Sequence, residues 1–112
     1  MNSRFWVDAR GRMPVREYLE ALERHGEAGA LATFGRVSAL VMADGPAVGM
    51  PHTRLIDRRF RLHEMRFGSH RIAYVVHDGD LVLLHAWRKR SQKLDTSEAE
   101  VARRRLRGIR DD

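Results

Sequence analysis

The chain has 112 residues, 43% hydrophobic and 32% charged, which suffices for one domain with a modest core and argues against disorder. It contains no cysteine, which excludes a disulfide framework, a thiolate metal site and a cysteine nucleophile, and which suits a reducing cytoplasm. No apolar run approaches the roughly 20 residues that cross a bilayer, so we expect a single soluble, cytoplasmic domain over residues 1–112 that does not enter a membrane.

The net charge of +6 arises entirely in the second half of the chain. Residues 1–53 contain 6 basic and 6 acidic residues, whereas residues 54–112 contain 15 basic and 9 acidic ones. All basic residues except Lys89 and Lys93 are arginine. Arginine favours bidentate contact with phosphate or carboxylate, although a GC-rich genome produces the same bias. A basic half predicts a polyanionic partner, such as nucleic acid, a ribosome or an acidic protein.

The first half of the chain predicts a short strand followed by two helices. Phe5-Trp6-Val7 is apolar and brief, as in an edge strand. Pro14 suits the first turn of a helix that Gly26 stops. A second helix over residues 27–43 ends before Gly45-Pro46. Each helix carries one apolar stripe, and we expect the two helices to form an antiparallel hairpin.

The second half predicts an antiparallel meander and a last helix. Alternating patterns predict three long strands over residues 60–67, 70–77 and 81–88. Asp78-Gly79 predicts a tight two-residue turn. Ser97, with Glu100 three residues later, predicts a capping box for a helix that reaches Arg107. Helices gathered on one side of such a sheet make an α+β two-layer domain, whose other sheet face we expect to be open.

Alternation along the strands predicts which side chains lie on each face. One face of the second long strand is apolar enough for the core and consists of Ile72, Tyr74 and Val76. Arg71 then belongs to the open face, and we expect Glu64 and Arg66 there too. Residues 83–87 are apolar and run without a break into the basic residues of 88–93. This stretch predicts a core strand whose end carries cations to the rim of the open face.

Three motifs follow one another along the predicted strands. They are Leu62-His63-Glu64-Met65-Arg66, His70-Arg71-Ile72-Ala73-Tyr74 and Trp87-Arg88-Lys89-Arg90-Ser91-Gln92-Lys93. With the two helices before them, they resemble the RelE/ParE superfamily of toxins from type II toxin–antitoxin systems, and most of all its phage-derived, HigB-like branch. The resemblance spans residues 5–107. It implies a RelE-like fold, with an N-terminal helical hairpin packed on a small antiparallel sheet and a C-terminal helix.

The resemblance also implies a function. Toxins of the RelE and HigB kind are mRNA interferases, which are endoribonucleases that cut messenger RNA in the ribosomal A site, inhibit translation and arrest growth. They use no metal and no cofactor. A cognate antitoxin, which is a small helix-turn-helix protein in this branch, forms an oligomer with the toxin and silences it. The pair represses its own operon.

Metal-free RNA cleavage needs a base for the 2′-hydroxyl, cations for the charged phosphorane and an acid for the leaving oxygen. The candidate catalytic residues are Arg66, Arg71, Glu64, Lys89 and His85. In this hypothesis the arginines and Lys89 hold the phosphate, and Glu64 or His85 is the base. The candidate RNA-binding residues are Arg61, Tyr74, Arg88, Arg90, Lys93, Arg103 and Arg104.

Each candidate also has a structural interpretation. Glu64 and Arg66 can pair with each other or with Arg71, and Tyr74 and His85 fit core positions. Trp87 is expected in the core. The C-terminal arginines complement a helix dipole as well as they fit ribosomal RNA. No helical pair of histidines with metal-ligand spacing occurs in the sequence, so we expect no metal site.

Two rival functions remain open at this stage. A ParE-like toxin of the same fold inhibits DNA gyrase and needs no catalytic residues, whereas a basic nucleic-acid-binding module binds phosphates without turnover. The tail, residues 107–112, also lacks the catalytic Tyr or His that several RelE and HigB relatives carry there. Either other residues do the acid–base work, or charge stabilisation dominates, or the protein does not cut RNA.

Overall fold

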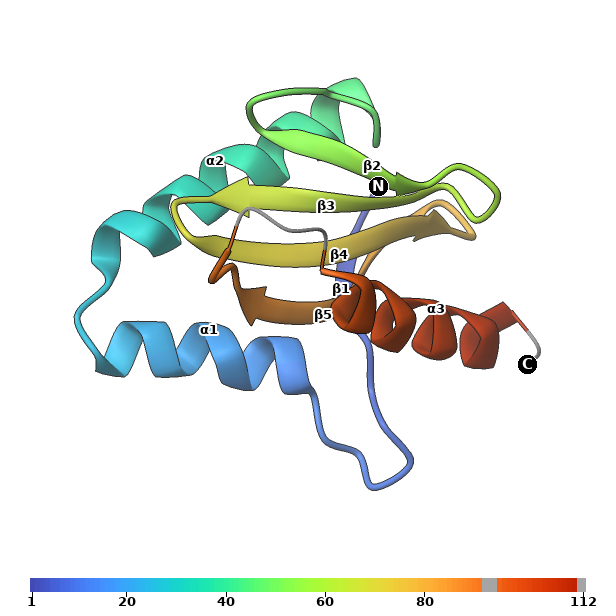
Figure 1. The fold of residues 1–112 in the computed structure, drawn as a ribbon, viewed down its shortest axis with the longest axis horizontal. Helices are drawn as coiled ribbons and strands as arrows, with labels where there is room; N and C mark the ends of the chain where they lie inside the picture. Colours follow the sequence, from blue (N-terminus) through green and yellow to red (C-terminus); the bar gives the residue numbers. More distant parts are fainter. Residues whose placement is uncertain (92–94, 111–112) are drawn as a thin grey trace.

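A computed structural model describes residues 1–91 and 95–110, and it confirms the expected α+β class. Its elements are β1 (Ser3–Phe5), α1 (Pro14–Arg24), α2 (Ala28–Asp44), β2 (Thr53–Asp57), β3 (Leu62–Phe67), β4 (His70–His77), β5 (Asp80–Arg88) and α3 (Thr96–Arg110). The five strands form one sheet in the order β1-β5-β4-β3-β2. All neighbouring strands are antiparallel except β1, which pairs parallel to β5 (Figure 1).

The helices α1 and α2 cover one side of the sheet, which we call the hairpin face. Helix α1 packs against β5 and α2 packs against β3. Pro14 begins α1, as predicted, and Gly45 with φ 98° ends α2. The hairpin-face core consists of Val15, Leu22, Val37, Val41, Met65, Phe67, Ile72, Tyr74, Leu81 and Leu83. Burial of these side chains, at about 1.5–3 kcal/mol for each large one, holds the helices on the sheet.

Helix α3 lies on the opposite side, which we call the α3 face (Figure 1). The expectation that all helices gather on one side of an open sheet is therefore wrong. The alternate strand residues are apolar too, so this face also needs a cover, and Ala102 and Leu106 of α3 supply it. The α3-face core consists of Leu62, Ala73, Val75, Val82, Leu84, Trp87, Ala102 and Leu106.

Several boundaries differ from the sequence-based expectation. The strand β1 begins two residues earlier than predicted, although it does lie at an edge. The strand β2 was not predicted, and Phe60 and Arg61 lie in the β2–β3 turn rather than in a strand. Ser97 lies inside α3, because the Asp95 carbonyl already accepts the first helical hydrogen bond, from the Ala99 N–H. The predicted capping role of Ser97 is therefore wrong.

The predicted tight turn between β4 and β5 is confirmed. Asp78 has φ 51° and Gly79 has φ 79°, which are the left-handed conformations that a two-residue hairpin requires. Within residues 1–91 and 95–110, no helix is long and apolar enough to span a membrane.

Candidate functional site

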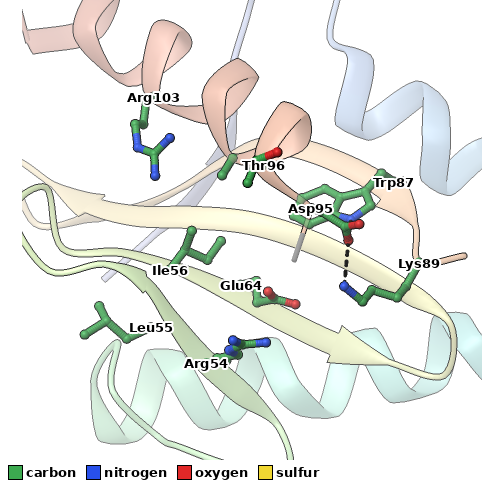
Figure 2. Close-up of a pocket in the computed structure, with 10 residues that line it drawn as sticks. Arg54, Leu55, Ile56, Glu64, Trp87, Lys89, Asp95, Thr96 and Arg103 are labelled. Atoms are coloured by element: carbon green, nitrogen blue, oxygen red, sulfur yellow. Dashed lines mark hydrogen bonds and ion pairs between the residues drawn. The ribbon is translucent and has the colours of Figure 1, made fainter. Parts of the chain in front are cut away.

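A pocket opens on the α3 face where the helix leaves the sheet uncovered, between β2 and the first turns of α3 (Figure 2). Its volume is about 90 Å³. The lining side chains come from β2, β3, β5, α3 and the connection between β5 and α3, and they are Arg54, Leu55, Ile56, Glu64, Trp87, Lys89, Asp95, Thr96, Ala99 and Arg103. The sheet register places Arg54 opposite Glu64. The apolar and the charged residues therefore share one concave surface.

An ion pair between Glu64 and Arg71 lies beside the pocket. The Arg71 Nε atom is 3.1 Å from Glu64 Oε2, and the two side chains are only 8% and 12% exposed. The buried Arg71 Nε–H has no hydrogen-bond acceptor among the described residues, so this contact is an ion pair only. Arg71 Nη1 donates to the carbonyls of Gly68 (2.9 Å) and His70 (2.8 Å). The β3–β4 turn thereby fixes the guanidinium.

Glu64 is a carboxylate that burial pushes toward its neutral form. Burial raises the pKa of the Glu64 carboxyl, although nearby cations favour the charged form. Those cations are Arg71, Arg54, Arg66 and Lys89. Burial also lowers the pKa of Arg71. A buried carboxylate with a raised pKa among cations in a pocket is a typical general acid or base.

A second carboxylate, Asp95, lies in the same pocket. Its Oδ2 accepts hydrogen bonds from Trp87 Nε1 (2.8 Å) and from Lys89 Nζ (3.1 Å). Burial alone would raise the pKa of Asp95, but these two hydrogen bonds lower it. Figure 2 shows Lys89 reaching toward Asp95 at the end of the pocket near α3. The two carboxylates of the pocket therefore have pKa values shifted in opposite directions.

All five predicted catalytic residues lie on the α3 face, and four of them gather at or beside the pocket. Arg66 lies opposite Arg71 in the sheet, and its Nη1 is 3.0 Å from the sulfur of Met50 at the rim. Glu64 and Lys89 line the pocket itself. The structure thus brings these charges together, and their chemical roles stay predictions.

His85, the fifth candidate, does not line the pocket. Its Nε2 is 3.3 Å from Glu98 Oε2, and its ring stacks on Trp87 with ring centroids 5.3 Å apart. Burial lowers the pKa of His85 and favours the neutral ring. The interpretation of His85 as a packed, hydrogen-bonded histidine fits this geometry better than a role as base for the pocket.

Tyr74 lies in the hairpin-face core, with none of its surface exposed. Its hydroxyl donates to the carbonyl of Pro46, and burial raises its pKa to about 12. The prediction that Tyr74 contacts RNA is therefore wrong, and its interpretation as a core tyrosine is confirmed. Trp87, which was expected in the core, is buried there with 7% of its surface exposed.

The other predicted RNA contacts are spread over the molecule. Arg88 pairs with Glu27 of the α1–α2 turn at 3.3 Å, away from the pocket. Arg103 lines the pocket and donates from Nε to Asp57 Oδ2 at 2.7 Å. Arg61, Arg90 and Arg104 are exposed. Lys93 lies outside the described residues.

Sequence reasoning missed Arg54 and Asp95. Arg54 was overlooked because β2 was not recognised, although the alternation in Thr53-Arg54-Leu55 was a usable signal. Asp95 precedes α3 in a connection whose conformation no periodicity encodes. No group of three or more His, Asp or Glu side chains placed to hold a metal occurs in the described part of the chain.

The chain was compared with known proteins. No curated protein matches it. The family model described as "Phage derived protein Gp49-like (DUF891)" matches residues 17–107, a range that includes every residue lining the pocket. That family is associated with the toxins of toxin–antitoxin systems. The chain therefore belongs to the phage-derived Gp49-like family.

Proposed function

We propose that this protein is the toxin of a type II toxin–antitoxin system of the RelE/HigB kind and acts as a metal-independent, ribosome-dependent endoribonuclease on messenger RNA. The observation that carries the proposal is the buried Glu64 carboxylate, whose pKa is raised beside Arg71 and Lys89 in a pocket. Membership of a toxin-associated family supports it. The earlier resemblance to RelE-type nucleases points in the same direction.

In the proposed reaction the RNA supplies its own nucleophile. Glu64 takes the proton of a 2′-hydroxyl, and the 2′ oxygen attacks the adjacent phosphorus. The bond from phosphorus to the 5′ oxygen breaks, and that oxygen leaves with a proton. The products are a 2′,3′-cyclic phosphate and a 5′-hydroxyl end. Lys89 is our candidate donor of the leaving-group proton.

The cations around Glu64 suit the charge that develops in this reaction. The phosphorane carries more negative charge than the ground state, so fixed cations stabilise it selectively. Arg71 meets this need best because its guanidinium is fixed by two backbone carbonyls. Burial raises the pKa of Glu64, which makes the carboxylate a stronger base than an exposed one.

The proposed partners follow from the same charge distribution. We propose that the ribosome and its messenger meet the α3 face through exposed arginines such as Arg61 and Arg104. A cognate antitoxin, a small helix-turn-helix protein, forms an oligomer with the toxin and neutralises it in this proposal. Gyrase inhibition and binding without turnover are the alternative outcomes of the test below.

The test is a cell-free translation reaction to which the purified protein is added. Primer extension then maps 5′ ends on the messenger, with and without a chelator and with translation blocked. We expect new ends inside the translated frame that depend on translation and survive the chelator. Arg71→Ala and Glu64→Gln should abolish them. Arg24→Ala, which removes an exposed charge from α1, is the matched control and should cut normally.

An intact messenger would overturn the nuclease proposal. A supercoiling assay with DNA gyrase would then decide whether the protein is a gyrase inhibitor. If the Arg71→Ala variant cleaved at the wild-type rate, the nuclease proposal would stand, but Arg71 would not belong to the active site.

A further inference from the structure

Part of the pocket is apolar, which phosphate binding does not require. Ile56, Ala99 and Trp87 line the pocket alongside the charged residues. Figure 2 shows Ile56 pointing from β2 toward the pocket, with Trp87 at its other end. A phosphate site needs cations and N–H donors, and an apolar wall weakens rather than helps it. These three side chains therefore indicate a second, less polar part of the ligand.

Polar groups at the rim are fixed in place. Arg103 donates from Nε to Asp57 at 2.7 Å and from Nη1 to Glu100 at 3.3 Å. Figure 2 shows its guanidinium reaching from α3 into the space above Ile56. The hydroxyl-bearing Thr96 lines the same side. A fixed guanidinium plane and an apolar wall are the surfaces on which proteins stack unpaired RNA bases.

The size of the pocket fits one planar ring system. Its volume is about 90 Å³, and a cavity needs about 10–15 Å³ to hold one water molecule, so roughly six to nine waters fit. That is room for one base but not for a base pair. The cations Lys89 and Arg54 line the same pocket, so a base in it and a phosphate at the cations belong to one nucleotide or to neighbouring ones.

We propose that this pocket binds a single unstacked nucleobase of the RNA beside the scissile phosphate. The inference rests on the proposed function, because it assigns the neighbouring cations to an RNA phosphate. Its test, however, measures binding and needs no cleavage.

Nuclear magnetic resonance titration of the full chain gives the sharpest test. The chain has two tryptophans, Trp87 in the pocket and Trp6 outside it, so its two indole N–H signals report separately on the pocket and on the remainder. The probes are the four ribonucleoside 3′-monophosphates and inorganic phosphate. We expect at least one nucleotide to shift the Trp87 signal and to bind about tenfold or more tightly than phosphate. The Trp6 signal should stay in place.

The second part of the experiment uses Ala99→Leu, whose larger side chain would fill the pocket from α3. We expect it to remove the tenfold advantage of the nucleotide without changing the affinity for inorganic phosphate. Ala39→Leu adds the same side chain at an exposed position of α2 and should bind like wild type. The wild-type comparison decides the matter by itself where Ala99→Leu does not fold.

Equal dissociation constants for phosphate and for all four nucleotides would overturn the inference. An Ala99→Leu protein that folds and retains the nucleotide advantage would overturn it too. Messenger cleavage without base-dependent binding would contradict the nucleobase site but not the proposed nuclease function. Base-dependent binding without cleavage would contradict the proposed reaction but would still support the pocket as a nucleobase site.

Discussion

The hairpin face and the α3 face are built from alternate residues of the same strands. On the hairpin face, β3 and β4 contribute the apolar and aromatic side chains of the core, including the fully buried Phe67 and Ile72, together with the buried histidines His63 and His70. On the α3 face, the same two strands contribute Glu64 and Arg71 next to an apolar half that α3 covers. The helices α1 and α2 pack on the first face, whereas α3 covers the second face only in part and leaves the charged pocket open.

The difference shows how a small sheet separates stability from chemistry. The apolar residues of both faces supply the burial that holds the fold. The uncovered half of the α3 face keeps buried charges whose desolvation the rest of the molecule must offset. In a domain of this size, the apolar core of the opposite face helps to offset that cost.

The largest effect we predict separates activity from stability on the α3 face. Glu64→Gln should reduce messenger cleavage by about 10²–10⁴-fold, as the loss of a general base does. The free energy of unfolding at pH 7 should not fall. Because burial raises the pKa of Glu64, its neutral form is the better tolerated one, and glutamine resembles that form. Cleavage kinetics and urea denaturation check the two halves, and a strongly destabilised variant would contradict the second.

Phe67→Ala should do the opposite on the hairpin face. The ring is fully buried and packs on Phe34, with ring centroids 5.6 Å apart. Its removal should lower the free energy of unfolding by about 3–5 kcal/mol, with no direct effect on the pocket. Urea denaturation measures the loss. Cleavage assayed under conditions where the variant is still folded should be near normal, and a loss of activity in the folded variant would link the two faces.

A pH series sharpens the same comparison. The folded-state pKa of Glu64 is raised, so the folded protein binds the proton more tightly than the unfolded chain. Relative to Glu64→Gln, wild type should therefore gain stability as the pH falls from above the folded-state pKa of Glu64 toward the ordinary glutamate pKa of 4.5. The gain should be complete below that value and lost again as pH rises. The free energy of unfolding of each protein is measured by urea denaturation at each pH. The difference between the two proteins reports the titration of Glu64, because the other titratable groups are common to both.

The sequence was sufficient to predict the three long strands, β3, β4 and β5, and part of the site. Alternation in β4 separated Ile72 and Tyr74 from Arg71, and that separation is the one the structure has. Alternation cannot say which helix covers which face, so the position of α3 was missed. Its stripe of Ala102 and Leu106 meets strand residues far away in the chain.

The pocket residues that the sequence did not predict were missed for other physical reasons. The strand β2 is five residues long, and its pairing with β3 shifts between Leu55 and Asp57. The regular alternation before this shift covers only Thr53-Arg54-Leu55, which is a weaker signal than the long strands give, and Arg54 was missed for that reason. The contact between Lys89 and Asp95 joins the end of a strand to the start of a helix. Such a contact depends on the path of a connection, which composition and period do not determine.

The smallest effect we predict concerns the charge outside the pocket. Arg61 lies exposed in the β2–β3 turn and Arg104 lies exposed on α3, whereas Arg24 lies exposed on α1. Each phosphate contact with single-stranded RNA contributes about 0.7 to the slope of log affinity against log salt concentration. Arg61→Gln and Arg104→Gln should each lower the slope by about that amount, and Arg24→Gln should leave it unchanged. Binding of a single-stranded RNA oligonucleotide across a salt series measures all three slopes. Equal slopes for all three variants would mean that RNA does not distinguish the α3 face from the hairpin face, and that the excess charge of the second half serves another partner.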